Sequence, residues 1–143
     1  MKFEVCIERG YLEQIEPSME LAKLSIKRAK ETLLSAAKNV EIGVYDGALL
    51  LAYLAMFHAA RAILYRDGWR EKSHACVSAY LREFYAERGR LDLKWVRYLD
   101  YVRNLRHQSQ YDVGFSPEST LVVEIMKIAK SFVEEMSKLV GGD

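Results

Sequence analysis

Apolar residues recur along this chain every three or four positions, which is the spacing of one face of an α-helix. No run alternates apolar and polar residues as a half-buried strand does, and β-branched residues are scattered. The pattern therefore predicts helices only, with a short turn before the first. Their approximate ranges are 18–38, 46–66, 73–87, 92–108 and 116–140.

Glycine, proline and capping side chains mark the ends of these helices. The Asp67-Gly68 pair is expected to end the second helix, because glycine readily adopts the left-handed conformation of a C-cap. Ser73 and Asp92 are expected to cap the third and fourth helices. Pro117 stands at the first position of the fifth, where its missing N–H is no loss. Gly141-Gly142 is expected to end that helix.

The predicted loops are short, and no repeat or low-complexity tract interrupts the 143 residues. Half of the chain is hydrophobic, enough for one core but not for two domains. Helices joined by short loops become antiparallel neighbours. We therefore predict an all-α fold: an up-and-down bundle of four to five helices, forming a single domain over 1–143 with its core at about 18–140.

The stretch Ala48–Tyr65 is apolar nearly all round, which predicts a helix in the middle of the bundle. Its 18 residues include His58 and Arg61, each costly inside a bilayer, so a core helix is favoured over a membrane span. Met1–Gly10 mixes charged with apolar residues, which is not typical of a signal peptide. We expect a cytoplasmic protein without membrane contact.

The two cysteines, Cys6 and Cys76, have neither a CxxC partner nor a histidine at metal-ligand spacing. We interpret both as reduced thiols in a cytosolic protein, although their pairing with each other stays open. The sequence contains no HxxxH, GxGxxG, phosphate-loop or GxSxG pattern. No metal and no other cofactor is therefore expected.

The formal net charge is only +1, but basic residues are concentrated in one region. Residues 61–106 contain 11 basic and 6 acidic side chains, and nine of the basic ones are arginine. The rigid fork of arginine suits phosphate better than the point charge of lysine does. An anionic partner is one interpretation of this region, and a solvated surface is the other.

Arg106 is the most unusual residue of the helix predicted over 92–108. At about 100° per residue, it falls in the centre of the apolar arc formed by Trp95, Leu99 and Val102. A guanidinium is not buried alone without a large penalty. Arg106 must therefore meet a carboxylate, reach a subunit interface or border a cleft, unless it extends to water near the helix end.

Two further polar pairs share helix faces. Arg103 and His107 are four residues apart and could hold a phosphate and transfer a proton, or only decorate the surface. His58 and Arg61 are three apart on an otherwise apolar helix. Either they border a site formed with another helix, or their polar groups are hydrated at the one solvent-exposed edge of their own helix.

Several of these residues resemble those of HEPN domains, most closely the short stand-alone prokaryotic and archaeal branch. The resemblance begins with Ala52-Tyr53-Leu54-Ala55-Met56-Phe57-His58-Ala59-Ala60-Arg61-Ala62, which is similar to the second helix of that family. Gly68 and Lys72-Ser73-His74 stand where the branch has a glycine turn and a Lys-Ser-His helix start. Its fourth helix ends in arginine, two residues, then Ala-Asp-Tyr. Here the segment 106–112 matches the arginine, the tyrosine and a following aspartate, with Ser109 and Gln110 replacing alanine and aspartate. The likeness covers roughly 18–140.

The resemblance implies a helical bundle, usually a homodimer, often paired with a minimal nucleotidyltransferase encoded alongside. Many HEPN proteins look like metal-independent RNA endonucleases with an arginine, a polar residue and a histidine four to six intervening residues after the arginine. Arg103-Asn104 supplies the start of that motif, but His107 follows after only three intervening residues. Counted from Arg106, the histidine position is closer to Tyr111.

We therefore predict a toxin-like, metal-independent RNA endonuclease that works with a nucleotidyltransferase antitoxin. Arg103 and Arg106 are the predicted phosphate ligands, and His107 is the predicted base. A two-fold dimer would bring a second His107 to act as acid. Residues predicted to bind RNA or a nucleotide are His58, Arg61, Gln110, Tyr111 and Asp112.

Tyr111 is expected just beyond the end of its helix. There it would line a groove, accept modification by the partner transferase, or close the end of the bundle. Two alternatives to the nuclease stay open. One is a non-catalytic module that binds a nucleotide, RNA or a partner protein, and the other is an adaptor in which Arg106 locks a helical dimer.

Overall fold

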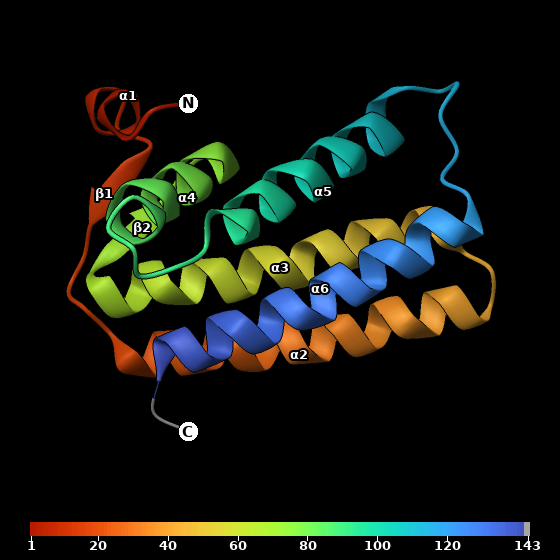
Figure 1. The fold of residues 1–143 in the computed structure, drawn as a ribbon, viewed down its shortest axis with the longest axis horizontal. Coiled ribbons are helices and arrows are strands. Elements are labelled where there is room, and N and C mark those ends of the chain that lie inside the picture. Colours follow the sequence, from red (N-terminus) through yellow and green to blue (C-terminus); the bar gives the residue numbers. More distant parts are fainter. Residues whose placement is uncertain (142–143) are drawn as a thin grey trace.

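The computed structural model describes residues 1–141, which form a helical bundle with one very small sheet (Figure 1). The elements are α1 (Phe3–Glu8), β1 (Leu12–Gln14), α2 (Met19–Glu41), α3 (Tyr45–Asp67), β2 (Trp69–Glu71), α4 (His74–Leu81), the π-helical turn η1 (Arg82–Ala86), α5 (Leu93–Tyr111) and α6 (Ser119–Val140). In Figure 1, α2, α3 and α6 form a long layer, and α1, α4 and α5 lie along one side of it. The predicted all-α class is confirmed.

Helix α3 is the centre of the bundle, as the apolar stretch predicted. Twelve of its residues are buried, and α2, α4, α5 and α6 all pack against it. By length and composition alone α3 could cross a membrane, but 67% of its most apolar window is buried inside the bundle. Its apolar surface is therefore covered by protein.

A buried polar network holds the C-terminal end of α3. Arg66 forms an ion pair with Asp67 and donates hydrogen bonds to the main-chain carbonyl of Leu139 and to the hydroxyl of Tyr85. Tyr80 and Tyr85 both donate to Asp67 Oδ2. Because these partners come from α3, α4, η1 and α6, the network fixes the relative positions of four elements.

Several predicted helix ends are wrong. Helix α5 continues to Tyr111, so this residue belongs to the helix rather than following it. The last predicted helix begins at Ser119, after Glu118 in the N-cap position, which places Pro117 outside the helix. The range 73–87 is not one α-helix, because a π-helical turn replaces its last part. Gly141 follows α6 with a positive φ, and Gly142 lies outside the described residues.

The prediction of helices only is also wrong. β1 and β2 form an antiparallel pair in which Leu12 faces Glu71 and Gln14 faces Trp69. Each strand has three residues, which is too short to show an alternating pattern. The pair joins the N-terminal segment to the turn between α3 and α4.

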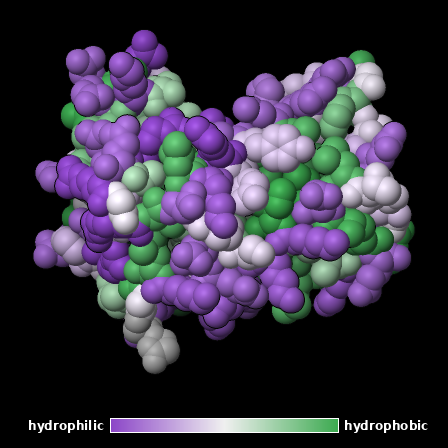
Figure 2. All heavy atoms as spheres, viewed as in Figure 1, coloured by the Kyte–Doolittle hydropathy of each residue, from purple (hydrophilic) through white to green (hydrophobic). Residues whose placement is uncertain are grey.

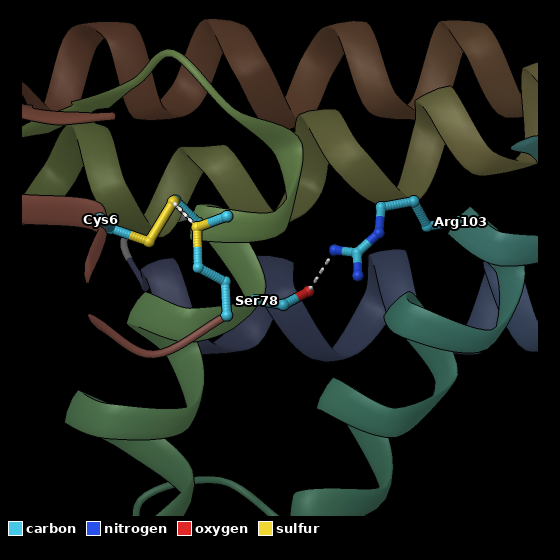
Figure 3. Close-up of a disulfide and its surroundings, with 5 residues drawn as sticks. Cys6, Ser78 and Arg103 are labelled. Atoms are coloured by element: carbon cyan, nitrogen blue, oxygen red, sulfur yellow. Dashed lines mark hydrogen bonds between the residues drawn. A yellow bond between two sulfur atoms is a disulfide. The ribbon is translucent and has the colours of Figure 1, made fainter. Parts of the chain in front are cut away.

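The two cysteines are not reduced thiols, which corrects the prediction from their spacing. Cys6 in α1 and Cys76 in α4 form a disulfide, seen in Figure 3, with a Cα–Cα distance of 5.9 Å. They lie 70 residues apart in the chain, so only the tertiary fold brings them together. Disulfides are rare in most cytosols, but intracellular proteins of hyperthermophilic archaea and bacteria are an exception.

Candidate functional site

Arg106 borders a pocket between the C-terminal half of α5 and the start of α3. The pocket has a volume of about 390 Å³, and its walls are Val44, Asp46, Gly47, Leu50, Arg106, Ser109 and Gln110. Arg106 Nη1 donates to Gln110 Oε1 at 2.9 Å, and its Cζ lies 4.6 Å from the ring centre of Tyr53. Its Nε is buried and has no hydrogen-bond partner in residues 1–141. Among the environments expected for this guanidinium, the structure shows the border of a cleft.

Arg103 lies one turn earlier on α5 and has a different environment. Its Nη2 is 3.3 Å from Asp100 Oδ1, and its Nη1 donates to Ser78 Oγ of α4 at 3.4 Å (Figure 3). Arg82 approaches the other carboxylate oxygen of Asp100 at 3.3 Å. The single carboxylate of Asp100 therefore serves two guanidiniums, and the Arg103 side chain joins α5 to α4.

Tyr53 and His74 connect α3 to the first turn of α4. The Tyr53 hydroxyl lies 2.8 Å from His74 Nδ1, and the imidazole stacks on Phe57 at a ring-centre distance of 3.9 Å. Burial raises the pKa of Tyr53 to about 12, so its hydroxyl is protonated at neutral pH. We call the set Tyr53, Phe57, His74, Ser78, Arg103 and Arg106 the α3–α4–α5 seam.

His58 and Arg61 lie further along α3, where it packs on α2. Both border a second pocket of about 440 Å³, together with residues of α2. Burial, with Arg61 and Arg28 nearby, lowers the pKa of His58 to about 4. Arg61 forms a two-pronged ion pair with Glu71 of β2, at 2.9 and 3.3 Å. The structure thus places this pair in a pocket, but Arg61 already has a protein partner.

His107, Tyr111 and Asp112 do not join the seam. The exposed imidazole of His107 lies 4.6 Å from the ring of Tyr111, which is 70% exposed. Asp112 follows α5, and its Oδ1 accepts a hydrogen bond from the backbone N–H of Gly114 at 3.0 Å. The predicted site residues therefore lie in three places. These are the α3–α4–α5 seam with its adjacent pocket, the pocket bordered by His58 and Arg61, and the exposed end of α5 with the residue that follows it.

Figure 2 shows the surface hollowed between the end that contains α1 and α4 and the C-terminal end of α5. Arg82, Asp100, Arg103 and Ser78 link α4 and η1 to α5. In the part of the chain that the structure describes, no three His, Cys, Asp or Glu residues are grouped so that they could hold a metal ion.

Sequence reasoning missed the role of His74 and Tyr53 in this arrangement. Both residues were part of the family resemblance, but neither was chosen as a site residue. Their contact joins positions 21 residues apart on different helices. The signal available in the sequence was a histidine at a predicted helix start, the third residue of the Lys72-Ser73-His74 segment.

The fold and the site together define a helical domain with arginine and histidine side chains gathered where α3, α4 and α5 meet. The family model of the HEPN domain matches residues 22–139, so the chain belongs to the HEPN domain family.

Two relatives, both archaeal, are similar over most of the chain. A "UPF0332 protein" of Archaeoglobus fulgidus is 31% identical over 122 residues, which cover 85% of this chain and 97% of that protein. A Methanocaldococcus jannaschii protein named "Putative toxin" is 29% identical over 133 residues, or 92% of each chain.

Proposed function

We propose that this HEPN protein is a toxin-like RNA endonuclease that works without a metal ion as a cytoplasmic homodimer. Membership of the family and the name of the Methanocaldococcus relative support a toxin-like role. Residues 1–143 would act as one domain with one active site. Its natural counterpart would be a nucleotidyltransferase antitoxin.

The observation that supports RNA binding best is the unsatisfied guanidinium of Arg106. Its Nε is buried without a hydrogen-bond partner among the described residues, and the groups it contacts, the amide oxygen of Gln110 and the side chain of Tyr53, are both neutral. A buried donor without a partner costs about 1–3 kcal/mol, more when it is charged. A phosphodiester entering the adjacent pocket would supply both the missing acceptor and the missing negative charge.

Cleavage at such a site needs two proton transfers. The 2′-hydroxyl of the RNA loses its proton to a base while its oxygen bonds to phosphorus. The bond from phosphorus to the 5′-oxygen breaks, and that oxygen takes a proton from an acid. The products are a 2′,3′-cyclic phosphate and a 5′-hydroxyl. Arg106 stabilises the charge on phosphorus, and His107, the next residue on α5, is one of the two proton-transfer groups.

Helix α5 provides a surface for dimerisation. Its exposed residues include Leu93, Tyr101 and Tyr111, which are 37%, 46% and 70% exposed. Large apolar and aromatic side chains on one outer helix face are typical of a protein interface. Pairing of two α5 helices through this face around a two-fold axis would bring the His107 of each copy, which lies beside Tyr111, close to the other copy.

The test is cleavage of a labelled single-stranded RNA in EDTA, followed on denaturing gels. We expect the purified protein to produce 2′,3′-cyclic phosphate ends, and Arg106→Ala to lose most of this activity. Arg88→Ala is the matched control, because Arg88 is exposed and lies on Phe84, away from α5. Intact RNA after incubation with the wild-type protein, or equal cleavage by Arg106→Ala, would refute the proposal. Light scattering measures the molar mass and so tests whether the protein is a dimer. Co-purification tests whether a nucleotidyltransferase encoded alongside binds this protein.

A second candidate is a non-catalytic module that binds RNA, a nucleotide or a partner protein. It is favoured by the ion pair of Arg103 with Asp100 and by the distance in sequence between Arg103 and His107, which is shorter than in the nuclease motif. In that case Gln110 and the other pocket residues would bind the ligand without cleaving it. Saturable binding in a calorimeter with no product on the gel would distinguish this module from the nuclease.

A further inference from the structure

His74 is held in one orientation by two side chains of α3. Nδ1 lies 2.8 Å from the Tyr53 hydroxyl, and the ring stacks on Phe57. The other ring nitrogen, Nε2, makes no hydrogen bond within residues 1–141 and is not among the buried unpartnered atoms. One nitrogen is thus fixed by the protein, and the other is open to a ligand.

The groups that face His74 are mostly cationic. Helix α5 contributes Arg103 and Arg106, with Asp100 paired to Arg103, and α3 contributes Tyr53, His58 and Arg61. From β2, Glu71 is paired to Arg61. Burial first, then Arg106, Arg61 and Arg103, lower the pKa of His74. The imidazole is therefore neutral at pH 7 and has a free lone pair for a proton.

His74 is also close to the guanidinium that lacks an anion. Arg106 lies over the ring of Tyr53, and the hydroxyl of the same tyrosine contacts the imidazole. His74 does not line the pocket beside Arg106, so a phosphodiester bound by Arg106 would have to extend past Tyr53 to reach the open side of His74. For Nε2 to accept a proton, Nδ1 must hold the other one and donate it to the oxygen of Tyr53.

We propose that His74, together with Tyr53 as its positioning residue, is the second proton-transfer group of this site, an inference that rests on the proposed ribonuclease function. Nε2 of His74 accepts the proton of the 2′-hydroxyl as its oxygen bonds to phosphorus. His107 donates a proton to the departing 5′-oxygen. The two histidines return to their starting states by exchanging protons with water, so no oxidant, reductant or metal takes part.

The experiment measures RNA cleavage between pH 4 and 9 for the wild type, His74→Gln, His74→Ala and Tyr53→Phe. General-base catalysis contributes about 10²- to 10⁴-fold, so we expect His74→Gln to lose at least about a hundredfold in kcat. The fall in rate on the acidic side of the wild-type profile should disappear in that variant. Added imidazole should restore part of the rate to His74→Ala, because it can occupy the space of the lost ring.

Tyr53→Phe removes only the hydroxyl. This variant should shift the acidic limb of the pH–rate profile and leave the affinity for RNA unchanged. Tyr11→Phe is its control, because Tyr11 is half-buried beside β1 and away from α5. The chain has three histidines, so NMR spectra of the variants identify the His74 signal and show whether each variant is folded. A folded His74→Gln variant that cleaves RNA with the wild-type pH profile would overturn the assignment and leave the ribonuclease intact. No cleavage by the wild type would instead overturn the proposed function itself.

Discussion

The disulfide between Cys6 and Cys76 should contribute a large share of the stability of this domain. The bond closes a loop with a sequence separation of 70 residues. Cross-linking restricts the unfolded chain, and for a loop of this length the loop-closure relation predicts about 4 kcal/mol at 25 °C. This value is an upper bound where the reduced unfolded chain retains structure.

The folded state should change little when the bond is reduced. Helix α1 is also held by Phe3, whose ring lies 4.9 Å from that of Phe84 and 6.1 Å from that of Trp69. The β1–β2 pair fixes the segment that follows α1. Because these contacts do not depend on the sulfur atoms, most of the effect of reduction acts on the unfolded chain.

Urea unfolding with and without a phosphine reductant measures this contribution. We expect the free energy of unfolding to fall by about 3–4 kcal/mol on reduction, with the far-ultraviolet circular dichroism of the folded protein unchanged. The Cys6→Ala/Cys76→Ala variant should unfold as the reduced wild type does and should not respond to the reductant. A difference below about 1 kcal/mol between the oxidised and reduced protein would refute the reasoning.

Three further predictions concern polar contacts around α3. Arg61→Ala leaves Glu71, whose side chain is 8% exposed, without its partner, and should cost about 2–3 kcal/mol in urea unfolding, part of which Glu71→Gln should restore. Tyr85→Phe removes a hydroxyl that donates to Asp67 and should cost about 1–2 kcal/mol in the same assay. The pKa of His58 is about 4 in the folded protein against 6.5 ordinarily, so the unfolded chain binds this proton first as the pH falls. Stability should therefore decrease from pH 6.5 to 4, and less steeply in His58→Gln; equal slopes would contradict this.

The central part of the fold follows from sequence because long, strongly periodic helices leave a clear pattern. The ranges 18–38 and 46–66 differ from α2 and α3 by at most three residues at either end. In both, the caps are local: Ser18 accepts a hydrogen bond from the N–H of Leu21, and Gly68 adopts a left-handed conformation after α3. Signals of this kind depend on a few neighbouring residues and can be recognised without the tertiary structure.

The errors arise where distant parts of the chain meet. The three-residue strands exist only because 12–14 and 69–71 pair with each other, and the disulfide has the same dependence on tertiary contacts. The same distinction between local and tertiary features applies to the candidate site. Helical spacing identified Arg106 as an unusual residue within its own helix. The contact of His74 with Tyr53 joins two helices, and a single sequence does not show which faces of those helices meet.

The arginine-rich region shows why a charge count is a weak guide to a ligand site. Arg61, Arg66, Arg82 and Arg103 each form an ion pair with a carboxylate, and each connects parts of the fold. The three carboxylates, Glu71, Asp67 and Asp100, offset three of these four positive charges without any ligand, because Arg82 and Arg103 share Asp100. Arg106 differs, because among the described residues its only hydrogen-bond partner is a neutral amide and its Nε is buried without one. This one guanidinium therefore indicates an anionic ligand, and a variant at this position tests for such a ligand more directly than any change in overall charge.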